Sequence, residues 1–148
     1  MAITQEYEAL STDLLQQYLA ERQEENLHLE FKLVNNAALA SRDDRRNLAC
    51  ALSGFANASG GLVVWGVEAR KNDNGIDSVV SLPGIRGVGA LVARLNQLTG
   101  QAVDPTVDGI QHRVVGVLDN NRGFGVTLVP ESDGGPHMAK LGEIAIAI

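Results

Sequence analysis

The sequence predicts an α+β fold, in which one domain holds a mixed, mostly antiparallel sheet with flanking helices. Three observations predict it. The chain has 148 residues, the length of one ordinary domain. Hydrophobic residues make up 45% and charged residues 20%, which is typical of a globular protein with a buried core. Segments with helical and strand periodicity follow one another in the order α β α β β α and then further strands.

The first two predicted elements are a helix and a strand. Residues Ser11–Arg22 carry apolar side chains at helical spacing, and Asp13 is the expected cap. Residues Leu27–Val34 alternate between apolar and polar types, which predicts a strand with one buried face. The side chains expected on that face are Leu27, Leu29, Phe31 and Leu33.

The next two predicted elements are a second helix and a central strand. Ser41–Ala58 has an apolar stripe, and Ser41 with Asp44 three residues later is a plausible capping pair. The glycines of Asn57–Gly61 predict a tight turn, which would also let a phosphate approach the backbone. Leu62–Glu68 is mostly apolar and predicts a strand inside the sheet.

The second half of the chain predicts one helix among short strands. The helical stripe runs from Val88 to Leu98, and Gly100 is the expected stop. A turn is expected at Asn120–Gly123. The predicted strands are Ile76–Val80, Val103–Thr106, His112–Leu118 and Gly125–Val129.

Composition excludes several classes of protein. No apolar run approaches the ~20 residues of a membrane span, and the N-terminus lacks the pattern of a signal peptide. The net charge of −6 counts against a general DNA-coating role, unless basic residues cluster or metal ions neutralise carboxylates. The single cysteine, Cys50, is expected to be a small core residue in a reducing, cytoplasmic setting.

Three acidic residues and one lysine are the candidates for catalysis. Glu30 and Lys32 are two apart on a predicted strand, so their side chains leave the same face. Glu25 precedes that strand, and Glu68 ends the strand Leu62–Glu68. If the two strands are neighbours, three carboxylates converge and can bind Mg²⁺ or Mn²⁺. The alternative is a solvated face with a surface ion pair.

The other polar residues point less clearly to chemistry. Arg70 and Lys71 follow Glu68 directly and would lie beside the acids, where they could hold phosphates. His28 shares the predicted face of Glu30, but the three histidines show no zinc spacing. Aromatic residues are only 4% of the chain, so few side chains are available to stack on nucleic-acid bases. The glycine turn lacks the P-loop pattern.

Two segments together resemble the Schlafen/AlbA_2 domain. They are Glu25–Lys32, which reads Glu-Asn-Leu-His-Leu-Glu-Phe-Lys, and Phe55–Glu68, which contains the two glycines and the apolar strand. The similarity extends over Glu25 to Met138. It suggests a division into an N-terminal helix (1–24), the domain itself (25–141) and a short tail or truncated edge strand (142–148).

The resemblance implies an α+β fold and a role with nucleic acid. Some Schlafen proteins are endoribonucleases that cut transfer RNA with three acids and a divalent metal, and Glu25, Glu30 and Glu68 match those acids. Their groove is built from two such lobes, so one lobe implies a homo-oligomer or a partner domain. The residues expected to contact nucleic acid are Lys32, Arg70, Lys71, Arg86 and Arg122.

Three functions are therefore open. The first is a nucleic-acid-binding domain that is also a metal-dependent endoribonuclease on RNA such as tRNA. In it, Glu25, Glu30 and Glu68 bind the metal, and Lys32 stabilises charge on the phosphate. The second is a non-catalytic module that binds DNA and regulates transcription. The third is a protein-interaction or oligomerisation domain.

Overall fold

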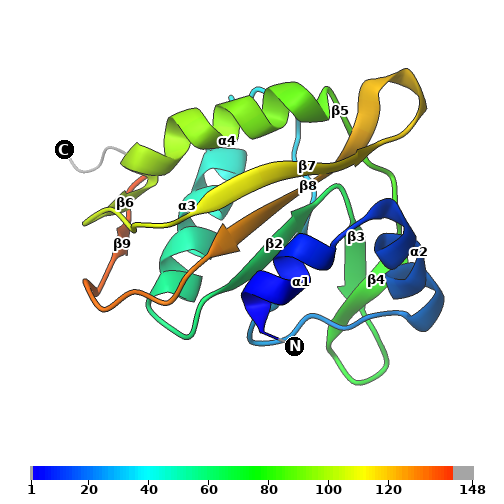
Figure 1. Cartoon of the computed structure of the whole chain (residues 1–148), viewed down its shortest axis with the longest axis horizontal. Coiled ribbons are helices and arrows are strands. Elements are labelled where there is room, and N and C mark those ends of the chain that lie inside the picture. Colours follow the sequence, from blue (N-terminus) through cyan, green and yellow to red (C-terminus); the bar gives the residue numbers. More distant parts are fainter. Residues whose placement is uncertain (1, 142–148) are drawn as a thin grey trace.

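The computed structural model describes residues 2–141. Its helices and strands are labelled in chain order in Figure 1. They are α1 (Ile3–Ala9), α2 (Thr12–Glu21), β1 (Leu29–Lys32), α3 (Arg42–Ala56), β2 (Gly61–Trp65), β3 (Glu68–Lys71), β4 (Asp77–Ser81), β5 (Ile85–Arg86), α4 (Val88–Ala102), β6 (Val103–Asp104), β7 (Gln111–Val117), the 3₁₀ turn η1 (Asp119–Asn121), β8 (Arg122–Val129) and β9 (Met138–Ala139). No helix in this part of the chain is long and apolar enough to cross a membrane.

A five-stranded sheet forms the centre of the molecule and confirms the predicted α+β class. β1 pairs with β2 in parallel, and all other pairs are antiparallel. β8 pairs with β2 and β5 along one edge and with β7 along the other, because its Gly125 lies opposite both Trp65 and Val114. Two small sheets, β3–β4 and β6–β9, stand beside it. β1 is thus an edge strand of the main sheet.

Helices cover both faces of this sheet (Figure 1). Alternation along the strands sends side chains such as Val63 and Trp65 toward α3 and α4, and Leu62 and Val64 toward α1 and α2. Both layers are apolar, which explains why every residue of β2 is buried. Glu30 and Lys32 alternate with the buried Leu29 and Phe31, so they face the α3 side.

The N-terminal region differs from the prediction in three respects. The structure has two helices where one was predicted, and the cap of α2 is Ser11, whose hydroxyl accepts from Leu14 N–H, rather than Asp13. The strand is shorter than Leu27–Val34: Leu27 is 84% exposed and Leu33 42% exposed, so both were wrongly predicted as buried. The capping of α3 by Ser41 is confirmed.

The predicted single strand Leu62–Glu68 is wrong, because Gly66 divides it. Gly66 has φ +100°, a left-handed conformation that glycine adopts without steric cost. Its N–H donates to the Lys32 carbonyl and its carbonyl accepts from Gly84 N–H, after which the chain leaves the sheet. Glu68 therefore begins β3, in a different sheet.

Two further predictions are corrected. Gly100 does not stop the third predicted helix, because α4 continues to Ala102, which is buried in the core. Cys50 is exposed rather than buried, because its side of α3 faces a pocket beside β1. The tail 142–148 lies outside the described residues.

Candidate nucleic-acid interface

Glu25 is built into the edge of the main sheet. The carbonyls of His28 and Lys32 accept from Leu62 and Gly66 N–H, so the N–H of Phe31 points away from β2. The Glu25 carboxylate accepts from that N–H at 2.9 Å, and Glu25 N–H donates to the Asp77 carbonyl at 2.8 Å. Glu25 therefore connects β1 to the β4 sheet.

The charge of Glu25 is constrained by its surroundings. Burial raises the pKa of its carboxyl above the ordinary value. The Phe31 hydrogen bond lowers that pKa, the charges of Glu30 and Asp77 raise it, and the charge of Lys32 lowers it. Glu25, Glu30 and Lys32 are thus within electrostatic reach of one another.

Glu30 and Lys32 form an ion pair in a pocket between β1 and α3. Lys32 Nζ lies 3.5 Å from Glu30 Oε1, and both side chains are partly exposed. The pocket has a volume of about 340 Å³ and, apart from Asn47, is otherwise lined by small and apolar residues, among them Leu27, Ala51 and Phe55. The lysine and the acid that were predicted to share a face do share it.

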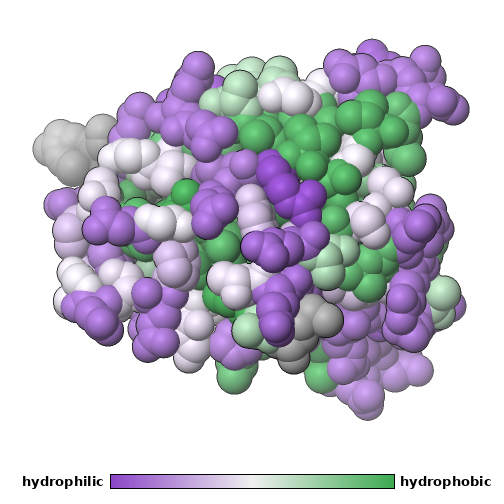
Figure 2. Space-filling view, viewed as in Figure 1, coloured by the Kyte–Doolittle hydropathy of each residue, from purple (hydrophilic) through white to green (hydrophobic). Residues whose placement is uncertain are grey.

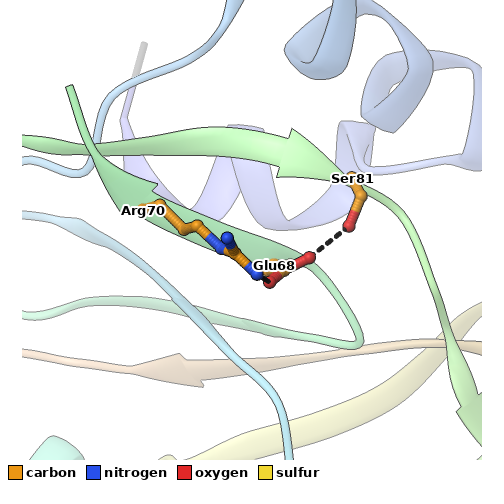
Figure 3. A network of polar contacts seen from close by, with 3 residues as sticks. All are labelled: Glu68, Arg70 and Ser81. Atoms are coloured by element: carbon orange, nitrogen blue, oxygen red, sulfur yellow. Dashed lines mark hydrogen bonds and ion pairs between the residues drawn. The ribbon is translucent and has the colours of Figure 1, made fainter.

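Glu68 points to partners of its own (Figure 3). Its Oε1 accepts from the Ser81 hydroxyl at 2.7 Å, and its Oε2 pairs with the Arg70 guanidinium at 2.7 Å. The Ser81 hydrogen bond and then Arg70 hold the pKa of the Glu68 carboxyl below its ordinary value. Figure 3 shows the three side chains lying along the β3–β4 hairpin.

The three carboxylates are each engaged separately: Glu25 with Phe31, Glu30 with Lys32, and Glu68 with Arg70 and Ser81. Within residues 2–141, no group of three His, Cys, Asp or Glu side chains is placed to hold a metal ion. As they stand, Glu25, Glu30 and Glu68 do not fit a shared divalent cation. Metal binding by these residues stays a prediction.

The predicted basic residues fall in three places. Lys32 lies in the pocket with Glu30. Arg70 and Lys71 line a groove of about 360 Å³ together with Arg22, Asn72 and Asp73. Arg86 and Arg122 line a separate pocket of about 440 Å³.

The groove of Arg22, Arg70 and Lys71 gathers cations from two elements. Arg22 ends α2 in a left-handed conformation, and Arg70 and Lys71 lie on β3. In Figure 2 the lower right of the molecule, where α2 and the tip of the β3–β4 hairpin lie in Figure 1, is predominantly hydrophilic. Sequence reasoning missed Arg22, because a polar helix end carries no signal for what it will face.

The histidines have structural partners. His28 Nδ1 donates to the Gly60 carbonyl at 3.0 Å, and buried His137 Nδ1 donates to the Pro105 carbonyl at 2.6 Å. Asn57, predicted only as part of a turn, holds the His137 backbone from both sides, with its amide donating to the carbonyl and its oxygen accepting from the N–H.

Comparisons with known proteins show the family of the domain and, separately, a similar fold. The family model described as Schlafen, AlbA_2 matches residues 25–136. Among solved structures, the chain is similar to the N-terminal domain of a RecG-related protein from Nitrosomonas europaea, with a TM-score of 0.58 and 21% identity. That alignment covers 90% of this chain and 82% of the other. No curated protein matches the chain significantly.

Proposed function

The chain belongs to the Schlafen AlbA_2 family, and on this basis we propose that it binds nucleic acid through the groove of Arg22, Arg70 and Lys71. Membership of the family indicates a nucleic-acid-binding domain. The observation that supports this location is the meeting of three cations from α2 and β3 in one groove. Because the whole chain carries a net charge of −6, attraction of a polyanion must come from such local clusters.

The state of Arg70 favours contact with phosphate. Its side chain is 73% exposed, and its only ion pair in the described part of the chain is with Glu68. Exposed ion pairs contribute little stability, so the guanidinium can exchange this carboxylate for a phosphate at small cost. Arginine binds phosphate with two parallel hydrogen bonds, while Lys71 adds a point charge.

Fluorescence anisotropy with labelled tRNA, single-stranded RNA and single-stranded DNA tests the groove. The double variant Arg70→Ala, Lys71→Ala should weaken binding to all three. It should also reduce the slope of log affinity against log salt by about one unit for each residue removed. Arg46→Ala, which removes an exposed arginine of α3, is the matched control. Equal binding by the double variant and the control would refute the location, and no binding by any form at low salt would favour a protein-interaction role.

The second candidate function is cleavage of RNA such as tRNA with Mg²⁺ or Mn²⁺. The observation that favours it is the Glu30–Lys32 ion pair at 3.5 Å, with Glu25 close enough for both charges to affect the pKa of its carboxyl. Glu25 and Glu30 are the metal ligands in this proposal, Glu68 can join them only by leaving Arg70 and Ser81, and Lys32 would contact the phosphate.

Incubation of labelled tRNA with Mn²⁺ or with a chelator tests this second function. Cleavage should require the metal, and Glu30→Gln should abolish it while leaving tRNA binding unchanged. Glu8→Gln, an exposed acid of α1, is the control. Cleavage that persists in chelator, or in Glu30→Gln, would contradict the assignment. The homo-oligomer or partner domain stays a prediction, which light scattering of the purified chain can check.

A further inference from the structure

Arg86 and Arg122 are paired directly across two strands. β5 and β8 run antiparallel, and Arg86 lies opposite Arg122 in the register. Like charges at directly opposite positions destabilise a sheet. Neither arginine forms an ion pair with an acid of the described residues. Within the described residues, the side chain of Arg122 makes only a long 3.4 Å hydrogen bond to the Pro83 carbonyl. The fold therefore holds two uncompensated cations side by side.

Both arginines line one pocket of about 440 Å³, which is within the range of small-ligand sites. The rest of the lining comes from the loop after β1 and from Pro83–Ile85, and it contains no acidic residue. Leu33, Pro83 and Ile85 form an apolar wall of the pocket. Asn35 and Asn36 also line it and carry amide side chains. A ligand that fits this lining carries a compact anion at one end and a flat or apolar body at the other.

Asp44 supports the loop that lines this pocket. It is buried on α3, and its carboxylate accepts from Asn35 N–H at 2.9 Å and from Asn36 N–H at 3.4 Å. These two backbone N–H groups therefore engage the Asp44 carboxylate, and their hydrogen bonds hold the loop backbone in place. α4 begins at Val88 with no acidic residue in its first turn, so its positive end adds to the field of Arg86.

We propose that this pocket binds a nucleotide through a phosphate monoester, with both guanidinium groups on the phosphate and the sugar and base along the apolar wall. A monoester carries a charge of about −1.5 to −2 at neutral pH, more than a backbone diester, and so complements two arginines better. The monoester can belong to a strand end or to a free nucleotide. The strand-end case rests on the proposed nucleic-acid binding, whereas the free-nucleotide case does not.

The test compares one short RNA strand in three forms, with a 5′-phosphate, a 3′-phosphate or hydroxyl ends, using anisotropy on the full chain. Nucleoside monophosphates and inorganic phosphate are titrated in parallel by calorimetry. One of the phosphorylated strands should bind about 10-fold tighter than the hydroxyl form, the factor that one good charge-assisted contact supplies. Binding of monophosphates as tight as that of the phosphorylated strand identifies a free nucleotide, and a gain confined to strands identifies a strand end.

The variants separate this pocket from the groove. Arg86→Ala with Arg122→Ala should abolish the gain from the terminal phosphate, while Arg70→Ala with Lys71→Ala should weaken all strands and preserve the gain. Arg122→Lys should lose most of the gain, because lysine lacks the planar fork. Asp44→Asn should reduce the gain from the terminal phosphate, because it weakens the hydrogen bonds that hold the loop. The backbone amide NMR resonances of Asn35 and Asn36 should then shift even before ligand is added. If terminal phosphate gives no gain and monophosphates do not bind, or if the gain survives in the Arg86, Arg122 double variant, the proposal is wrong.

Discussion

The carboxylate of Glu25 accepts a hydrogen bond from the backbone N–H of Phe31 at 2.9 Å, on the open side of β1. One of the three acids expected to bind metal thus also closes the edge of the sheet. Loss of an acid can therefore abolish activity for structural reasons, so stability must be measured beside activity.

We expect Glu25→Ala to destabilise the fold by about 1–2 kcal/mol, because it leaves the Phe31 N–H without its acceptor. Glu25→Gln keeps an acceptor oxygen and should cost less. Glu30→Ala loses only a partly exposed ion pair and should stay within about 0.5 kcal/mol of the parent. Urea denaturation of the three variants measures this order. Equal losses of unfolding free energy in Glu25→Ala and Glu30→Ala would argue against a stabilising role of Glu25 at the sheet edge.

We expect Ser81→Ala to raise the pKa of Glu68 toward its ordinary value. The Ser81 hydroxyl hydrogen-bonds to the charged carboxylate, and this bond is the largest cause of the low pKa. Arg70→Ala should also raise the pKa, since Arg70 lowers it through its hydrogen bond and through its charge. Carboxyl NMR titration of the three proteins gives the comparison. An unchanged pKa of Glu68 in Ser81→Ala would contradict this assignment.

His112 makes stability depend on pH. Its Nε2–H donates to Thr99 Oγ1, whose hydroxyl donates to the Leu95 carbonyl, and its Nδ1 accepts from Thr127, which accepts from Trp65 Nε1–H. This arrangement needs the neutral ring, and burial lowers the pKa of His112 to about 4 from 6.5. The unfolded chain therefore binds a proton first as the pH falls.

The stabilisation from this network should be complete above pH 6.5 and should fall as the pH drops from 6.5 toward 4, by on the order of 3 kcal/mol. Guanidinium unfolding at several pH values measures it. His112→Gln removes the titrating group and should have a lower stability with a flatter pH dependence in that window. A parent protein with constant stability between pH 6.5 and 4 would contradict the role of His112.

We expect Arg86→Thr to stabilise the fold by a few tenths of a kcal/mol, because it removes a cross-strand pair of like charges and places a β-branched residue in a strand. Lys71→Thr is the matched contrast. Lys71 lies opposite Asp77, so its replacement removes a favourable pair and should not stabilise. Thermal unfolding compares them. A loss of stability in Arg86→Thr would mean that the two arginines are not in conflict.

Much of the fold follows from periodicity. The apolar stripe of α3, its Ser41 cap and the buried β2 were predictable because each depends on neighbours within one or two turns or within one strand. The short α1 was missed, as were β5 and β9, since elements of two to seven residues carry too little pattern. Leu27 was misread because alternation alone does not say where a strand starts.

The candidate site divides in the same way. The amino-acid sequence alone determined which residue types are available and that Glu30 and Lys32 share a face, because side chains alternate along any strand. Only the tertiary structure decided which distant groups meet. The positive φ of Gly66 turns Glu68 into a hairpin with Ser81, the end of α2 brings Arg22 to Arg70, and strand register sets Arg86 against Arg122. These meetings depend on chain direction and on pairing between segments far apart, which no local pattern encodes.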